Sequence, residues 1–204
     1  MTEPRHSELP ERPTRGHGLL EPWLARLRAR KANQLISGEL RNGKVLDIGC
    51  GTSPYFLANT SFQERFGIDR VGETRTCGEV RLRHLDLNNF DTLPFPDESF
   101  NVVTMLAVVE HLDPGRVAQL FRESGRLLIP GGMVIVTTPA SWTDGLLHFL
   151  GRCQLVSQEE VAEHQYAYSL PVLGWYFGQA GFEMNKIRFG YFEAYMNMWA
   201  TAVK

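Results

Sequence analysis

The stretch Val45-Leu46-Asp47-Ile48-Gly49-Cys50-Gly51 decides how the rest of the chain is interpreted. It is an apolar run that carries one acid and stops at two glycines separated by one residue. This pattern predicts a buried parallel strand whose carboxyl end opens into a turn, the place where open α/β sheets bind ligands. Gly49 and Gly51 can adopt backbone angles closed to other residues and leave room for a ligand beside the main chain.

Asp47 determines which charge a ligand at this turn can carry. Its carboxylate lies in the strand just before the glycines, so it suits a cationic group and repels a pyrophosphate. The third glycine of a dinucleotide fingerprint is replaced by Pro54, and no Gly-Lys-Ser/Thr phosphate loop is present. The motif therefore favours a nucleoside-like ligand with an ammonium or sulfonium group. A tight structural turn after a buried strand is the alternative that these residues alone leave open.

The composition is that of an ordinary soluble globular protein. The chain has 204 residues, 43% hydrophobic and 22% charged, with a net charge of −2 and a pI near 6.3. These values predict a single domain and argue against a broadly basic surface that binds nucleic acid. Cys50, Cys77 and Cys153 lack the spacing of a zinc site or a disulfide framework. No apolar run approaches the ~18 residues of a membrane span, and a cytoplasmic location is expected.

The domain is expected to carry additions at two places. Residues 1–18, rich in Pro, Arg, Glu and His, predict a mobile tail, which leaves residues 19–204 as the folded domain. Apolar residues at helical spacing in 19–42 predict an amphipathic helix that covers the sheet edge or the mouth of the site. A basic helix that meets acidic lipid or glycan is the alternative for that segment. Residues 140–168 lose the regular pattern and predict a lid or acceptor-binding region.

Strands and helices alternate through the rest of the chain. Asp113 followed by Pro114 predicts the start of one helix, and Ser169 is expected to cap another. Residues 71–79 are expected to form a loop. The predicted strands lie near 44–49, 65–70, 80–87, 100–106, 133–138, 182–190 and 195–203. This order predicts a doubly wound, Rossmann-like α/β sheet, mostly parallel, with helices on both faces and an antiparallel C-terminal hairpin.

Three acids follow three successive predicted strands. Asp47, Asp69 and Asp86 lie at strand ends that line one crevice in a doubly wound sheet. Asp69 follows Gly51 at about the 20-residue spacing at which an acid meets ribose hydroxyls. Asp86 could accept a hydrogen bond from an exocyclic amine while Leu87 packs on a purine. Together with the glycine turn, these acids indicate an adenosine-type ligand.

These residues resemble the motifs of class I S-adenosylmethionine-dependent methyltransferases of the small-molecule "type 11" kind. The stretch 45–52 is similar to the first motif of that family, Gly67-Ile68-Asp69 to its second-strand acid, and Leu85-Asp86-Leu87 to its adenine segment. Residues 93–112, 127–132 and 163–182 resemble its later segments, so the resemblance covers roughly 45–204. It implies a seven-stranded sheet, S-adenosyl-L-methionine as cofactor and S-adenosyl-L-homocysteine as product.

The resemblance also implies roles for individual residues. The methionine part would lie against Asp47 and the glycine turn, the ribose against Asp69, the adenine against Asp86 and Leu87, and the methyl group near Leu106. Pro54 to Phe56 replace the longer first helix of the family. The full expected cofactor-binding set is Asp47, Gly49, Cys50, Gly51, Asp69, Arg70, Asp86, Leu87, Leu106 and Ala107.

His111 and His164 are the candidate general bases. Histidine titrates near neutral pH, so either could remove a proton from a hydroxyl acceptor during in-line methyl transfer. Capping of the following helix and packing in a loop are the respective structural alternatives. Some related methyltransferases are similar in holding a divalent cation with Glu-x-x-Glu-His and a distant His. Ala107 stands at the first glutamate position here, so no tight metal site is expected.

The sequence therefore predicts methyl transfer from S-adenosylmethionine to a small molecule, or to a glycan or secondary-metabolite intermediate. The expected partners are that acceptor and a second copy of the chain in a homodimer, with no nucleic acid and no integral membrane segment. A non-catalytic module that binds an adenosine ligand stays open as an alternative. A nicotinamide-dependent oxidoreductase is disfavoured by Pro54 and Asp47. The residues do not choose between oxygen, nitrogen and carbon as the acceptor atom.

Overall fold

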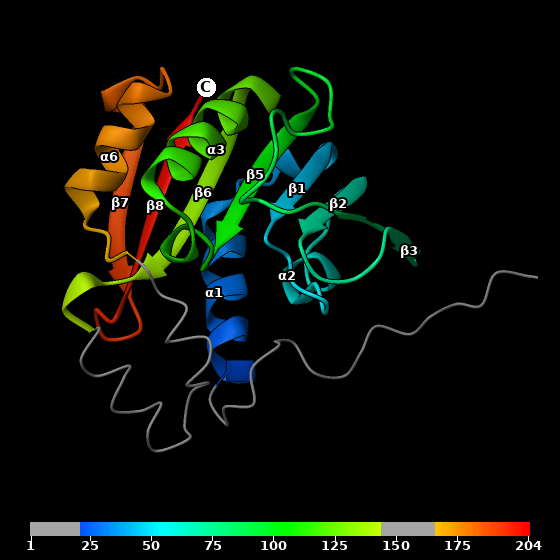
Figure 1. Cartoon of the computed structure of the whole chain (residues 1–204), viewed down its shortest axis with the longest axis horizontal. Helices are drawn as coiled ribbons and strands as arrows, with labels where there is room; N and C mark the ends of the chain where they lie inside the picture. Colours follow the sequence, from blue (N-terminus) through cyan, green and yellow to red (C-terminus); the bar gives the residue numbers. More distant parts are fainter. Residues whose placement is uncertain (1–20, 144–165) are drawn as a thin grey trace, which may run out of the picture.

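The computed structural model describes residues 21–143 and 166–204, and these build an eight-stranded sheet with helices packed on it (Figure 1). The strands are β1 (Lys44–Ile48), β2 (Glu64–Asp69), β3 (Arg75–Cys77), β4 (Val80–His84), β5 (Phe100–Leu106), β6 (Leu128–Pro139), β7 (Ile187–Phe192) and β8 (Asn197–Val203). Their order is β3-β4-β2-β1-β5-β6-β8-β7. The five from β4 to β6 are parallel, while β3, and the pair β7 and β8, form antiparallel edges.

Helices cover both faces of the sheet. The helices are α1 (Glu21–Leu35), α2 (Tyr55–Ala58), α3 (Pro114–Leu127) and α6 (Leu170–Gln179), with single 3₁₀ turns η1 (Glu39–Asn42), η2 (Val109–His111), η3 (Ser141–Thr143) and η4 (Met184–Lys186). Successive strand residues point to opposite faces. Leu46 and Val103 therefore join the core under α3 and α6, whereas Val45 and Val102 join the core under α1 and α2. Figure 1 shows α3 and α6 in front of the sheet and α1 behind it.

The predicted fold class is confirmed, and the sheet has one strand more than the seven expected. The additional strand is β3, in the segment 71–79 that was expected to be a loop. Gly78 has a φ of +57°, and the short turn there folds β3 back on β4 with Cys77 opposite Val80. The third predicted strand also ends earlier, at His84, so Asp86 and Leu87 lie beyond it.

Helix α1 packs on the sheet through small side chains. Ala29, Ala32 and Ile36 are buried in the core on that face, whereas Trp23 is 50% exposed. Trp23 is one of the apolar residues whose helical spacing predicted this helix, so the prediction was wrong for that residue. Alanines allow the helix to lie closer to the strands than a tryptophan would. None of the described helices has both the length and the apolar character needed to cross a bilayer.

The two predicted helix caps have different outcomes. The carboxylate of Asp113 accepts hydrogen bonds from the backbone N–H groups of Gly115 and Arg116 at 2.9 and 3.1 Å, so it caps α3 as predicted. Ser169 precedes α6, but its side chain makes no capping hydrogen bond. The predicted side-chain cap of α6 is therefore wrong, and Pro171 in the first turn removes one of the donors that a cap would satisfy.

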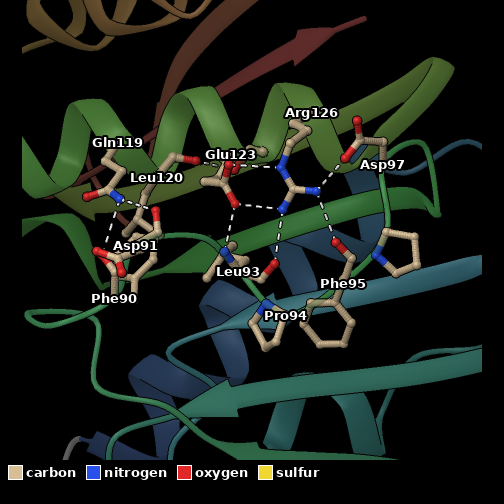
Figure 2. A network of polar contacts seen from close by, with 12 residues as sticks. Phe90, Asp91, Leu93, Pro94, Phe95, Asp97, Gln119, Leu120, Glu123 and Arg126 are labelled. Atoms are coloured by element: carbon tan, nitrogen blue, oxygen red, sulfur yellow. Dashed lines mark hydrogen bonds and ion pairs between the residues drawn. The ribbon is translucent and has the colours of Figure 1, made fainter.

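A polar network fixes the long connection between β4 and β5 to α3 (Figure 2). The guanidinium of Arg126 donates to the backbone oxygens of Leu93 and Phe95 at 3.0 Å and to both carboxylate oxygens of Glu123. Glu123 accepts in turn from the Leu93 N–H at 2.7 Å. One turn earlier on the helix, Gln119 donates to two further backbone oxygens of the connection. The predicted adenine-binding residues Asp86 and Leu87 lie in the same connection, ahead of the part that α3 holds.

Candidate active site

The glycine turn after β1 has the geometry that its sequence predicted. Gly49 and Gly51 have φ angles of +74° and +70°, which L side chains rarely adopt. A Cβ on Gly49 would lie 2.4 Å from Val108 Cγ2, whereas a Cβ on Gly51 would meet nothing closer than the Ser53 nitrogen at 4.0 Å. The space beside Gly49 is therefore filled by the segment after β5. The space beside Gly51 is open.

Asp69 at the end of β2 is held in place by the backbone around it. Gly51 N–H donates to Oδ2 and Val71 N–H donates to Oδ1, both at 2.8 Å. A carboxylate oxygen can accept more than one hydrogen bond. One carboxylate thus ties the glycine turn after β1 to the residue that follows β2.

Asp47 is a buried acid in the middle of the sheet. It is 4% exposed, and the Thr104 hydroxyl donates to its Oδ1 at 2.6 Å. Burial raises the pKa of the Asp47 carboxyl to about 7, against the effect of the Thr104 hydrogen bond and with a further contribution from the charge of Asp69. Sequence reasoning missed Thr104, although it is the polar residue inside the apolar run of β5.

Two other predicted cofactor residues, Cys50 and Arg70, flank these acids. The Cys50 N–H donates to the backbone oxygen of Ile68 at 3.2 Å, and its Sγ packs toward Gly67, where an added Cβ would lie 2.7 Å away. The Cys50 side chain therefore packs against β2. Arg70 is exposed directly after Asp69.

Asp86 and Leu87 lie at the same rim of the sheet but differ in exposure. The Leu85 N–H donates to the Asp69 backbone oxygen at 2.9 Å, which keeps this segment beside β2. Asp86 is exposed, and its Oδ1 accepts from the Asn88 N–H at 3.0 Å. Leu87 is 7% exposed and belongs to the core under α3. The structure thus buries Asp47 and Asp69 at neighbouring strands and leaves Asp86 at the surface.

The end of β5 brings Leu106 and Ala107 to the rim of the sheet. Ala107 has a φ of +58°, an unusual angle for a residue with a Cβ, and its N–H donates to the Thr137 backbone oxygen at 2.9 Å. A residue with a Cβ keeps such an angle only where the surrounding structure holds it there, and such residues are concentrated at functional sites. The turn at Ala107 sends Val108 across Gly49.

The segment after this turn carries the predicted catalytic residue His111 and a buried acid, Glu110, directly before it. His111 ends η2 and is partly buried, and His164 lies outside the described residues. Glu110, beside His111, is 2% exposed, and neither of its carboxyl oxygens has a hydrogen-bond partner within the described part of the chain. The Tyr168 hydroxyl is also buried without a partner. Within residues 21–143 and 166–204, no three His, Cys, Asp or Glu side chains gather as a metal site would require.

A comparison with models of protein families finds the family to which this chain belongs. The family model described as "Methyltransferase domain" matches residues 17–187. This chain belongs to the methyltransferase domain family. A human protein named "Probable tRNA methyltransferase 9B" is 26% identical over 113 residues, which is 52% of this chain and 23% of that protein. A Mycolicibacterium smegmatis protein named "Probable S-adenosylmethionine-dependent methyltransferase" is 36% identical over 101 residues, which is 47% of this chain and 37% of that protein.

A solved structure shares the fold of this methyltransferase domain. The S-adenosylmethionine-dependent methyltransferase from Mesorhizobium loti superposes with a TM-score of 0.63 at 14% identity, covering 89% of this chain and all of that one. The chain spans well under half the length of the two curated relatives. Family membership supports the predicted identity of the cofactor, S-adenosylmethionine.

Proposed function

We propose that this methyltransferase domain transfers a methyl group from S-adenosylmethionine to a small molecule or to a glycan or secondary-metabolite intermediate. The observation that carries the proposal is the buried Asp47 carboxyl beside the anchored Asp69, next to a turn that is open at Gly51. A buried acid with a single hydrogen bond gains from a cationic partner, because that partner replaces the lost hydration. These two acceptor groups therefore fit a ligand with a positive charge at one end and a diol beyond it.

In this proposal each residue acts on a different part of the cofactor. Asp47 binds the ammonium group, Asp69 accepts hydrogen bonds from the ribose hydroxyls, and Asp86 with Leu87 binds the adenine. When bound, the cofactor supplies an electrophilic methyl group on a positively charged sulfur. Leu106 and Ala107 border the place of that methyl group and keep water away. The remaining members of the set, Gly49, Cys50, Gly51 and Arg70, shape the turn around the methionine part.

The acceptor is proposed to be a small molecule because the charge pattern gives little support to a polynucleotide. The net charge is −2, and several of the described arginines are already paired with acids, among them Arg65 with Glu79 and Arg81 with Glu64. Such pairing reduces the positive field that would attract phosphates. A tRNA acceptor is the second candidate, since three relatives, from human, mouse and cattle, are named as probable tRNA methyltransferases.

Calorimetric titration with S-adenosylhomocysteine tests the cofactor assignment. We expect saturable binding that Asp69→Ala weakens by at least about tenfold, because two charge-assisted hydrogen bonds are removed. Asp91→Ala is the matched control, since this exposed acid lies away from the glycine turn in the connection between β4 and β5. Absence of binding at millimolar concentration, or tighter binding of NADH, would reject the proposal. Retention of bulk tRNA on a filter at physiological salt would favour the second candidate.

A further inference from the structure

Two buried polar side chains have no role in the cofactor site described above. Glu110 is 2% exposed and Tyr168 is 3% exposed. Among the residues that the structure describes, neither carboxyl oxygen of Glu110, nor the hydroxyl of Tyr168, has a partner at hydrogen-bond distance and angle. Buried polar groups are nearly always paired, so each exception calls for an explanation. The two groups also do not bond to each other. The polar neighbour of the Tyr168 hydroxyl is Tyr176, whereas both carboxyl oxygens of Glu110 keep their hydrogen-bonding capacity for a third group.

Both groups lie near the carboxyl end of β5. Glu110 belongs to η2, three residues after Ala107, and its backbone oxygen accepts from the Tyr166 N–H at 3.4 Å. Tyr168 follows two residues later, just before α6, and packs in the core under α3. Burial raises the pKa of Tyr168, with further contributions from Tyr176 and from the charge of Glu110. The Tyr168 hydroxyl therefore keeps its proton at neutral pH and can donate a hydrogen bond.

Structural roles do not account for Glu110. No lysine or arginine of the described residues forms an ion pair with it, unlike Glu123, which is also buried but bonds to Arg126. The helix that follows is capped by Asp113 instead. Glu110 is thus a buried carboxyl without an ion pair, a capping role or a hydrogen bond. A ligand that donates a hydrogen bond to its carboxyl oxygens best explains it.

We propose that Glu110 and Tyr168 bind the methyl acceptor and that its reacting group is a hydroxyl, so the reaction is an O-methylation. This inference rests on the proposed function. A hydroxyl donates one hydrogen bond and accepts others, so it matches the acceptor oxygens of Glu110 and the donor of Tyr168 together. An ammonium group offers donors only, and a neutral amine needs no base at the reacting step.

With an alcohol acceptor, the methyl group would move from sulfur to oxygen in a single displacement. A lone pair of the hydroxyl oxygen forms the bond to the methyl carbon, and the carbon–sulfur bond breaks with both electrons remaining on sulfur. The hydroxyl proton passes to Glu110, which later releases it to water. The products are a methyl ether, a neutral thioether and one proton. Glu110 thus removes the charge that would otherwise develop on the ether oxygen.

Fragment binding to the protein saturated with S-adenosylhomocysteine tests this inference without turnover. The probes are three alcohols and their methyl ethers: phenol with anisole, benzyl alcohol with its methyl ether, and cyclohexanol with methoxycyclohexane. We expect saturation-transfer NMR to show at least one alcohol binding about fivefold more tightly than its ether, the value of one added hydrogen bond. The preference should fall below twofold in the Glu110→Gln/Tyr168→Phe variant. It should persist in Glu98→Gln, which changes an exposed acid at the opposite end of β5.

The melting temperature and the S-adenosylhomocysteine affinity of the double variant show which assumption fails, if one does. Removing groups that have no partner should leave the melting temperature of the double variant unchanged or raised, and a fall of more than about 5 °C would show a structural role and overturn the inference. Equal affinity for alcohol and ether in the wild type, or a preference retained in the double variant, would overturn it as well. The double variant should bind S-adenosylhomocysteine as the wild type does. Loss of that binding in the wild type would defeat the proposed function itself, whereas the fragment comparison addresses the acceptor site alone.

Discussion

At the scale of single residues, Asp47 is the group in which the requirements of folding and of the proposed function conflict. Its carboxyl is buried with one hydrogen bond, from Thr104, and burial raises its pKa to about 7. The folded-state pKa lies above the unfolded value of 3.8, so the stability that the neutral form contributes is fully present below pH 3.8. That stability is lost as the pH rises through about 7.

Asp47→Asn should therefore stabilise the ligand-free protein at alkaline pH. The pKa difference corresponds to about 4 kcal/mol as an upper value at pH 8, and the advantage should disappear toward pH 4. Urea unfolding at both pH values measures it, with Asp91→Asn as the control. The same variant should bind S-adenosylhomocysteine about 10- to 100-fold more weakly, because a charged hydrogen bond is lost. Equal stability of variant and wild type at pH 8 would contradict this account of Asp47.

The two glycines of the turn should respond differently to alanine. Gly49→Ala places a Cβ 2.4 Å from Val108 Cγ2 in a left-handed conformation, and we expect it to cost about 2–4 kcal/mol of stability. Gly51→Ala adds only the backbone strain of about 1 kcal/mol, since no atom lies near its Cβ. Its methyl group would instead occupy the open side of the turn. Gly51→Ala should thus fold nearly normally and lose cofactor affinity, as thermal melts and calorimetry would show together.

At the scale of elements, helix α3 does more than cover the sheet. Glu123 and Arg126, with Gln119 one turn earlier, bind the backbone of the connection that leads from Asp86 and Leu87 to β5 (Figure 2). Burial acts to raise the pKa of Glu123, but the hydrogen bonds from Arg126 and the Leu93 amide outweigh it and lower that pKa. The stability from this lowered pKa is present above pH 4.5 and is lost as the pH falls through the folded-state value.

Removing Arg126 should disrupt this connection. Arg126→Ala leaves Glu123 buried without its ion partner and frees two backbone oxygens, so we expect a loss of about 3–5 kcal/mol at pH 7. The loss should shrink as the pH falls through the lowered pKa of Glu123, because the protonated carboxyl no longer needs an ion partner. Arg126→Lys should recover little, because one ammonium cannot reproduce the planar fork of donors. Arg122→Ala, an exposed change on the same helix, should stay within about 0.5 kcal/mol. A similar loss in both alanine variants would show that helix propensity, not the network, is being measured.

At the scale of the whole molecule, the proposed ligand joins elements that are separate in the sequence. Residues of β1, β2 and the segments after β4 and β5 would contact one molecule, so its binding should stabilise the domain as a unit. At 100 times its dissociation constant, S-adenosylhomocysteine should add about 2.7 kcal/mol to the free energy of unfolding at pH 8. Below pH 7 the increment should decrease, because Asp47 is then protonated in the free protein and binding must first remove that proton. Thermal shift measurements from pH 5.5 to 8 check this, and a pH-independent increment would exclude Asp47 as the partner of the ammonium group.

Two expectations about the whole molecule stay predictions. A homodimer would be detected by light scattering on the purified chain, and a cytoplasmic location requires imaging in the source cell. The proposed role of residues 140–168 in binding the acceptor falls mostly on 144–165, outside the described residues. Tyr168, at the end of that range, is described, and it enters the acceptor site inferred above.

The sequence by itself determined the fold class, because alternation of strands and helices and a glycine turn after an apolar strand are local patterns of backbone and hydrophobicity. It also indicated Asp47 and Asp69, whose positions at strand ends follow from that alternation. Only the tertiary structure decided which groups meet: Thr104 with Asp47, Val108 with Gly49, and the Tyr166 N–H with the Glu110 backbone oxygen. It also decided that Asp86 is exposed while the other two acids are buried. Burial and pairing depend on residues far apart in the chain, and no local pattern records them.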